Sequence, residues 1–310
     1  MESTRIGKKI ILLACCFFPL LLGGCSDKPE LISTSHAAVR RTFTIGLIPE
    51  VDIFAQKKRY EPLACYLSSK LDINVELKIL SRYGNVIDNF VSEGMDAAFF
   101  GSFTGALALK KLGVIPLVRP EGGDGVSTYY GMIFARKDSA IKTAADMKGK
   151  RFACVDKATT AGWLLPLHFF KEIGITDFGS WFGEVYFAGT HEDAIYDVLN
   201  RDADMGAAKN TVFYRFAAQD SRVKNELEIL ATSPRIPENG LAVRSGYDKN
   251  MLIRLKKVLL DMERDPAGQG VLKKFGAARF IETHAADYQV VVDFASSVGV
   301  DMASYQYTNN

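Results

Sequence analysis

The segment Val155–Gly162 combines residue types that could bind an anion. An apolar strand-like run ends at Val155, and Thr159 and Thr160 stand where an apolar helical pattern begins. A helix start exposes backbone N–H groups without intrahelical partners, and the helix dipole adds partial positive charge there. With two hydroxyls beside them, these groups could hold the oxygens of a small anion. The alternative is an ordinary threonine N-cap, which is the commoner use of such residues.

Strand-like apolar runs alternate with helical patterns on both sides of this segment. Such alternation predicts an α/β architecture with largely parallel sheets. A helix at 3.6-residue spacing is expected between the first two runs, around residues 60–71. The predicted strands cover residues 43–48, 75–80, 96–100, 130–135, 152–155 and 185–188.

The chain is long enough for two lobes. Roughly 270 residues follow the N-terminal segment, which is long for a single core. The middle third forms one complete α/β unit, so we predict lobe two at residues 129–234 and lobe one at 42–128 plus 235–310. Two chain crossings would then form a hinge. The cleft between the lobes is the expected ligand site.

Residues 1–24 are typical of a lipoprotein signal peptide. Three basic residues precede an apolar run, residues 10–22, that is too short to cross a bilayer comfortably. The ending Leu22-Gly23-Gly24-Cys25 resembles a bacterial lipobox, which predicts a lipidated Cys25 and a periplasmic, membrane-anchored protein. Ser26 resembles an outer-membrane sorting signal. Residues 25–41 would be the lipidated cysteine and a flexible tether.

Charge and cysteine content exclude several classes of protein. The chain has 38 Lys and Arg and 36 Asp and Glu, and 35 of each remain once residues 1–24 are removed. A neutral protein is not expected to bind nucleic acid. Beyond Cys25 only Cys65 and Cys154 remain, and we expect two buried free thiols. No cysteine pair has metal-ligand or redox spacing.

Enzyme chemistry is not expected. The chain has no nucleotide-binding fingerprint, and the serine of Gly101-Ser102-Phe103-Thr104-Gly105 is misplaced for a nucleophile elbow. Only His168, His191 and His284 could serve as a general base in the folded part. We therefore predict neither a catalytic site nor a metal or cofactor.

Seven short segments carry recognisable motifs: residues 46–50, 59–63, 96–102, 135–139, 147–156, 187–191 and 233–237. In this order, between about residues 43 and 250, they resemble the periplasmic phosphate/phosphite/phosphonate-binding proteins of ABC transporters (the PhnD-like family). The resemblance implies a type II, Venus-flytrap fold that holds the phosphorus oxygens mainly in lobe two, and it implies ABC permease and ATPase subunits as partners. We expect the protein to be a monomer.

The resemblance also implies particular ligand contacts. In lobe two these are Thr159, Thr160, Ala161 and His191, with Ala161 replacing the third hydroxyl usual in the family. For His191 the alternative is a capping or core histidine. Lobe one should supply a loop after the strand 96–100, at the sheet edge where α/β clefts bind ligands. The expected contacts there and at the hinge are Ser102, Phe103, Phe54, Glu50 and Tyr129, with core packing as the alternative for the three aromatic residues.

Two departures from the family pattern limit the ligand. Aminoethylphosphonate binders place carboxylates in two regions, which here read Gly206-Ala207-Ala208-Lys209-Asn210 and Ile236-Pro237-Glu238-Asn239-Gly240. Lys209 would repel a ligand ammonium, and neutral Asn239 would attract it far less than an aspartate. Lys209, Asn210 and Asn239 are therefore expected around a ligand without an amine. A solvated surface position is the alternative for Lys209.

Together these features predict the solute-binding component of an ABC importer, binding a small phosphorus oxyanion or phosphonate in the interlobe cleft. An aminoalkylphosphonate is not expected. The alternative is a ligand-sensing periplasmic lipoprotein that acts with a membrane sensor protein.

Overall fold

The computed structural model describes residues 40–309. The predicted signal peptide, the lipid site Cys25 and most of the predicted tether lie outside the described residues. Within the described part, no helix combines the length and apolar character needed to cross a membrane.

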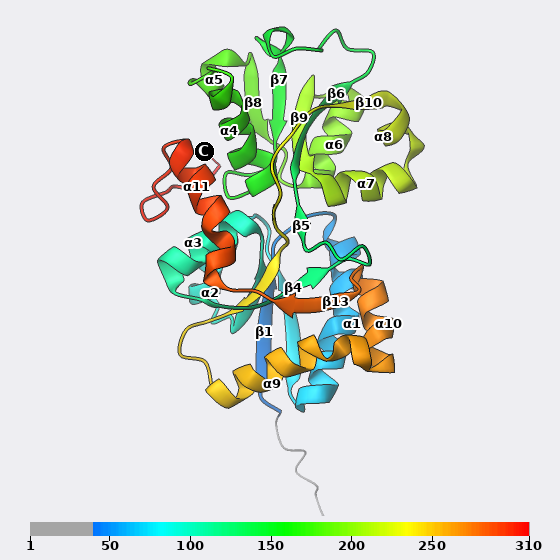
Figure 1. The fold of residues 1–310 in the computed structure, drawn as a ribbon, viewed down its shortest axis with the longest axis vertical. Coiled ribbons are helices and arrows are strands. Elements are labelled where there is room, and N and C mark those ends of the chain that lie inside the picture. Colours follow the sequence, from blue (N-terminus) through cyan, green and yellow to red (C-terminus); the bar gives the residue numbers. More distant parts are fainter. Residues whose placement is uncertain (1–39, 310) are drawn as a thin grey trace, which may run out of the picture. The chain divides into compact units, whose positions relative to one another are not determined.

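The first of two main sheets has six strands in the order β13-β4-β12-β3-β1-β2 (Figure 1). Strand β1 is parallel to β2 and β3, whereas β12 runs antiparallel to β3 and β4. We call this sheet and its helices lobe one. Its strands are β1 (Thr42–Leu47), β2 (Asn74–Ile79), β3 (Ala97–Phe100), β4 (Ile115–Glu121), β12 (Gly240–Val243) and β13 (Arg279–Glu282).

The second sheet has five strands in the order β10-β6-β9-β7-β8, and with its helices it forms lobe two. Strand β7 is parallel to β8 and β9, whereas β6 runs antiparallel to β9 and β10. Both sheets are therefore mixed, and the prediction of largely parallel sheets was only partly right. The first strand after each chain crossing, β6 in lobe two and β12 in lobe one, runs antiparallel to its neighbours in the sheet. The strands are β6 (Gly131–Arg136), β7 (Arg151–Cys154), β8 (Glu184–Phe187), β9 (Met205–Lys209) and β10 (Leu227–Thr232).

Helices connect and cover the strands (Figure 1). Lobe one contains α1 (Ile53–Leu71), α2 (Asn85–Ser92), α3 (Ser102–Leu112), α9 (Lys249–Leu260), α10 (Pro266–Phe275) and α11 (Gln289–Ser297). Lobe two contains the π-helix η2 (Thr160–Leu164), α4 (Leu165–Glu172), α5 (Phe178–Trp181), α6 (His191–Asn200), α7 (Asn210–Gln219) and α8 (Ser221–Glu226). Short 3₁₀ turns are η1 (Ala145–Met147), η3 (Met262–Arg264) and η4 (Ala285–Tyr288).

Two antiparallel segments carry the chain between the lobes. The chain leaves lobe one through β5 (Thr128–Tyr129) and returns through β11 (Ile236–Pro237), and these two strands pair with each other. The C-terminal segment adds a third connection, because the Trp163 indole donates to the Tyr305 hydroxyl over 2.8 Å. Figure 1 shows α11 extending from lobe one towards α4. A predicted two-lobed α/β fold with two hinge crossings is thus confirmed.

The apolar core runs continuously from lobe one into lobe two. One cluster of buried side chains includes Phe103 of α3, Tyr129 of β5 and Leu164 of η2. Burial on this scale supplies most of the stabilisation of a fold. Cys154 lies buried in β7 as a free thiol, whereas Cys65 lies on an exposed position of α1. The prediction that both thiols are buried was wrong for Cys65, because the apolar face of α1 lies on its other side.

Candidate functional site

The segment after β7 folds back tightly before it becomes a helix. The backbone N–H of Val155 donates to the carbonyl of Gly162 over 3.1 Å. A Cβ at residue 162 would lie 2.4 Å from the Cβ of Val155, so only glycine allows this approach. The close contact fixes the start of η2 against the end of the buried strand. We call residues 159–162 the cradle.

The two threonine hydroxyls of the cradle have different partners. The Thr159 hydroxyl donates to the carbonyl of Asp156 over 2.7 Å, which orders the loop itself. The Thr160 hydroxyl accepts a bond of 2.8 Å from the backbone N–H of Phe103 in lobe one. Ala161 is buried and contributes only its backbone. The first N–H groups of a helix have no intrahelical acceptors, so η2 presents donors at the cradle.

His191 is the first residue of α6 and is buried. Burial lowers its pKa from 6.5 to about 3, so the ring is neutral at pH 7. Its Nδ1 accepts from the backbone N–H of Lys209 at 3.3 Å. A neutral imidazole whose Nδ1 accepts carries its proton on Nε2. His191 is therefore a neutral hydrogen-bond donor, as the binding of an anion would need.

Tyr83 is a candidate site residue that the sequence did not single out. It follows β2 in lobe one, and its ring packs edge-on against the His191 ring with centroids 5.9 Å apart. The Tyr83 hydroxyl is buried and has no hydrogen-bond partner among residues 40–309. Burial raises the pKa of this hydroxyl well above its usual range, so it stays protonated. An unpartnered buried donor is unusual, and a bound acceptor would satisfy it. Its position just after a strand's carboxyl end was the available signal.

Ser102 and Tyr129 meet between the lobes as expected. The Ser102 hydroxyl lies 3.1 Å from the Tyr129 hydroxyl and donates to the carbonyl of Pro237 over 2.5 Å. Phe103 contributes its backbone N–H, because its ring is buried against Tyr305 with centroids 5.4 Å apart. The structure does not bring Phe54 to this group, since its side chain is 78% exposed at the first turn of α1.

Lys209 ends β9 and is 3% exposed, so the alternative of a solvated surface position was wrong. Its Nζ lies 3.0 Å from Oε1 of Glu50 and 3.3 Å from Oδ1 of Asn239, and it also contacts the carboxylate of Glu238. The same Nζ lies 4.4 Å from the centre of the Tyr129 ring. We call these four partners, Glu50, Glu238, Asn239 and Tyr129, the ammonium cage.

Lys209 and Glu50 stabilise each other in their ionised forms. Burial by itself would lower the pKa of Lys209, but Glu238 and Glu50 outweigh burial and raise this pKa. Burial would likewise raise the pKa of Glu50, but the positive charges of Lys209 and Arg59 hold this pKa well below its usual range. The guanidinium of Arg59 lies 3.7 Å from Glu50. The cage is therefore a paired ionic cluster.

Asn210 fixes the strand next to the hinge. Its side-chain oxygen accepts from the backbone N–H of Tyr130 over 3.0 Å, and its own backbone N–H donates to the Tyr130 carbonyl at the same distance. Asn210 also lines a cavity of about 220 Å³ with Glu50, Lys209 and Glu238. Residues from both lobes therefore border this cavity.

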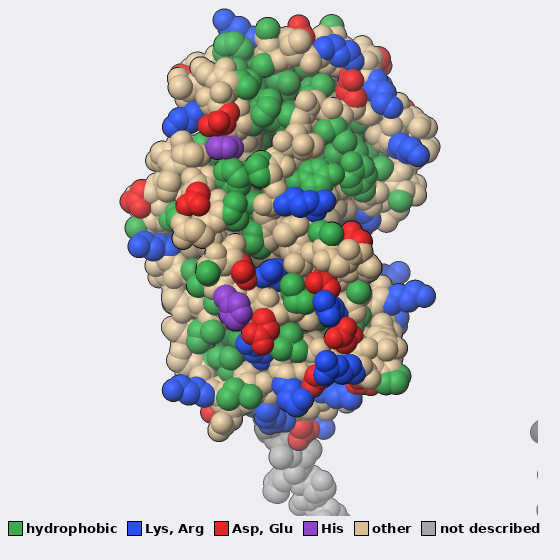
Figure 2. Space-filling model, in the orientation of Figure 1, with side chains coloured by type: hydrophobic (Ala, Val, Ile, Leu, Met, Phe, Trp, Pro, Cys, Tyr) green, Lys and Arg blue, Asp and Glu red, His purple; other side chains and the backbone are tan. Residues whose placement is uncertain are grey.

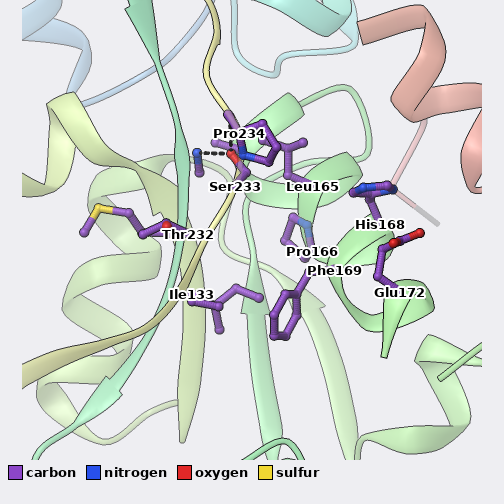
Figure 3. A pocket seen from close by; sticks show the side chains of 13 residues that line it. Ile133, Leu165, Pro166, His168, Phe169, Glu172, Thr232, Ser233 and Pro234 are labelled. Carbon is purple, nitrogen blue, oxygen red and sulfur yellow. Dashed lines mark hydrogen bonds between the residues drawn. The ribbon is translucent and has the colours of Figure 1, made fainter. Parts of the chain in front are cut away.

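A second, apolar pocket lies behind the cradle. Ala161 lines it with Ile133, Leu165 and Phe169. Figure 3 shows the side chains of Ile133, Leu165 and Phe169 around the pocket. The dashed line at Ser233 is the 2.8 Å bond that its hydroxyl accepts from the Gly131 N–H. Figure 2 shows hydrophobic side chains gathered over this part of lobe two. The lining of this pocket is mostly apolar, so it offers few groups that could orient an anion.

The described residues contain no group of three or more His, Cys, Asp and Glu side chains that could hold a metal ion. The neutral hydrogen-bond donors are instead the cradle and His191 in lobe two and the hydroxyl of Tyr83 in lobe one. Such donors favour a small oxyanion.

Two mixed sheets joined by two paired chain crossings are the arrangement of the type II periplasmic binding protein fold. Solved structures agree. A binding protein of an ABC phosphonate transporter from Pseudomonas aeruginosa superposes with a TM-score of 0.77, at 19% identity over 82% of this chain and 85% of that one. PhnD1 from Prochlorococcus marinus, in complex with methylphosphonate, superposes with a TM-score of 0.74, at 20% identity over 83% and 98%.

Residues 45–288 match the model of the family described as ABC transporter, phosphonate, periplasmic substrate-binding protein, and the chain belongs to this family. It is 28% identical to the phosphate-import protein PhnD of Mycolicibacterium smegmatis over 82% of each chain. It is 22% identical to the phosphonates-binding periplasmic protein of Escherichia coli over 84% of this chain and 78% of that one. The predicted family and the predicted role as a transporter's solute-binding protein are confirmed.

Proposed function

We propose that this protein captures a small phosphorus oxyanion or a compact phosphonate in the cleft and delivers it to an ABC permease and its ATPase. One observation carries the proposal. The start of η2 and the neutral His191 supply donors from lobe two, and lobe one supplies the Tyr83 hydroxyl, which has no partner among residues 40–309 and whose ring packs against that of His191. When donors on both sides of a cleft bind the same acceptor, the ligand stabilises the closed form. A transporter can then recognise the closed form.

The relatives support a phosphorus ligand. One imports phosphate by name, and another was solved with methylphosphonate. Each charge-assisted hydrogen bond to such an anion contributes about 1.5–3 kcal/mol net. Three or four of them would account for most of a micromolar affinity, which corresponds to about 8 kcal/mol.

The site assignment within this function is also ours. We assign the phosphorus oxygens to Thr160, Ala161, His191 and Tyr83, with Ser102 and Tyr129 closing the cleft from the lobe-one side. Thr159 orders the loop, because its N–H and its hydroxyl both donate to the carbonyl of Asp156. The proposed lobes are residues 129–234 and residues 42–128 plus 235–310. We further propose that Cys25 carries a lipid anchor and that the protein acts as a monomer at the periplasmic side of a membrane.

Titration calorimetry on the purified protein tests the function. Phosphate, phosphite and methylphosphonate are each titrated at pH 7, with sulfate as the control oxyanion. We expect at least one phosphorus anion to bind in the micromolar range or tighter. The absence of heat from all three, with a folded protein, would overturn the proposal. The double variant Thr160→Val with His191→Ala should abolish the signal, and unchanged affinity would overturn the site assignment.

A further inference from the structure

The ammonium of Lys209 fills a site with the composition of an amine receptor. Two carboxylates and one amide oxygen contact its Nζ, and the face of an aromatic ring lies 4.4 Å away. Carboxylates combined with an aromatic face are the groups that bind alkylammonium cations in proteins. Glu50 follows β1, Glu238 and Asn239 follow β11, and Tyr129 belongs to β5. The fold, and not one local segment, therefore builds this cage.

The ammonium and its partners come from different parts of the molecule. Lys209 belongs to a strand of lobe two, whereas Glu50 belongs to lobe one and Glu238 to the returning crossing. The side chain of Lys209 is 4% exposed and that of Glu50 is 6% exposed. Buried charges are tolerated only when they are paired. Lys209 thus neutralises Glu50 and Glu238, and Arg59 adds a second positive charge 3.7 Å from Glu50.

We propose that Lys209 is a tethered ammonium that occupies the cation subsite of the cleft and excludes phosphorus ligands that carry an amine. This inference rests on the proposed function. A ligand ammonium would have to share two carboxylates with Lys209, and like charges so close together repel strongly at a buried site. The Tyr129 ring links the two ends of the site, since its hydroxyl meets Ser102 and its face meets Lys209. The allowed ligands are compact anions with hydrogen, hydroxyl or a short alkyl group on phosphorus.

The cavity lined by Asn210 and Lys209 would give a small cation access to the cage in a variant with a shorter side chain at residue 209. The cavity of about 220 Å³ is lined by Glu50, Lys209 and Glu238, and also by Arg215. None of the cradle residues lines it. An alkylammonium in this cavity could therefore reach the carboxylates without disturbing the cradle. Lys209→Ala should convert the cage into an empty receptor for such a cation.

The first test needs no phosphorus ligand. Thermal unfolding of the wild type, Lys209→Ala and Lys209→Arg is followed while methylammonium chloride is added, with sodium chloride as the ionic-strength control. We expect methylammonium to raise the Tm of Lys209→Ala by several degrees more than sodium does. The wild type and Lys209→Arg should respond equally to both salts. Equal responses in Lys209→Ala would overturn the inference, whatever the outcome of the phosphorus titrations.

The second test measures selectivity. Calorimetry compares ethylphosphonate with 2-aminoethylphosphonate, which differ by the terminal amine. We expect the wild type to prefer ethylphosphonate and Lys209→Ala to shift this preference at least ten-fold towards the amine. Lys209→Met, which keeps the stem and loses only the charge, repeats the comparison if the alanine variant is unstable. A preference that is unchanged in both variants would overturn the inference.

Discussion

The backbone N–H of Phe103 in lobe one donates to the hydroxyl of Thr160 in lobe two over 2.8 Å. The cradle is therefore attached to the opposite lobe by one of its own hydroxyls. A residue at an oxyanion site that also bonds across the cleft couples ligand capture to closure, since both events use the same segment.

Replacing Thr160 with valine should weaken both binding and closure. The variant leaves the buried N–H of Phe103 without its acceptor, which costs about 1–2 kcal/mol. We expect the affinity for the best phosphorus anion to fall about five- to thirty-fold in calorimetry. Thr232→Val is the matched control, because Thr232 is an exposed residue of β10. An equal loss in the control would contradict a role for Thr160 itself.

Replacing Tyr83 with phenylalanine should change stability and affinity in opposite directions. Its hydroxyl is buried without a partner among the described residues, so removing it should stabilise the ligand-free protein by about 1 kcal/mol. The affinity for the phosphorus anion should fall, because a donor is lost. Urea unfolding and calorimetry measure the two effects.

Tyr247→Phe is the control for this experiment. The Tyr247 hydroxyl is also buried without a partner among residues 40–309, but its ring packs against Phe43 in the lobe-one core. The control should gain stability and keep its affinity. If Tyr83→Phe also keeps full affinity, Tyr83 does not contact the ligand.

His191 should make the protein less stable in mild acid. Its pKa is about 3 in the folded protein and about 6.5 in the unfolded chain, so below pH 6.5 the unfolded state binds the extra proton. The free energy of unfolding should therefore fall as the pH decreases from 6.5 towards 3, and this contribution is absent above pH 6.5. His191→Gln should show a shallower decrease in urea unfolding over this range. Identical slopes would show that His191 is not buried in its neutral form.

The C-terminal segment should slow the release of ligand. The Tyr305 hydroxyl accepts from the Trp163 indole and donates to the carbonyl of Lys157 over 2.9 Å, directly before the cradle. Tyr305→Phe removes both bonds, so we expect a several-fold faster dissociation rate in stopped-flow experiments. Gln306→Ala, at an exposed neighbouring position, should leave the rate unchanged. If Tyr305→Phe and the wild type release the ligand at the same rate, the C-terminal segment does not contribute to closure.

Much of the fold could be predicted from sequence because its signals are local. The alternation of apolar runs and helical patterns identified β1, β2, β3, β6, β7 and β8, whereas β4 and β5 were missed. The antiparallel strand β12 could not be placed, because its neighbours β3 and β4 lie far away in the chain.

In the site, too, residues indicated by local patterns could be predicted and residues that depend on distant contacts could not. Thr160 and His191 stand at helix starts, which local patterns indicate. Glu238 was missed and Lys209 was left open between cleft and surface. Glu238 pairs with Lys209, and Lys209 pairs in turn with Glu50, which lies 159 residues from it in the sequence. Ion pairs between distant segments leave no periodic signal. For Phe54, the exposed first turn of α1 turns the ring away from the site that its sequence position suggested.

A crystal structure of the purified protein with the tightest-binding phosphorus anion tests the central claim most directly. The account predicts the phosphorus oxygens within hydrogen-bond distance of the backbone N–H groups at the start of η2, the Nε2 of His191 and the hydroxyl of Tyr83. The ammonium of Lys209 should remain in its cage. An anion bound instead among Arg59, Arg215 and Arg235 in the neighbouring cavity, with the cradle empty, would contradict the account.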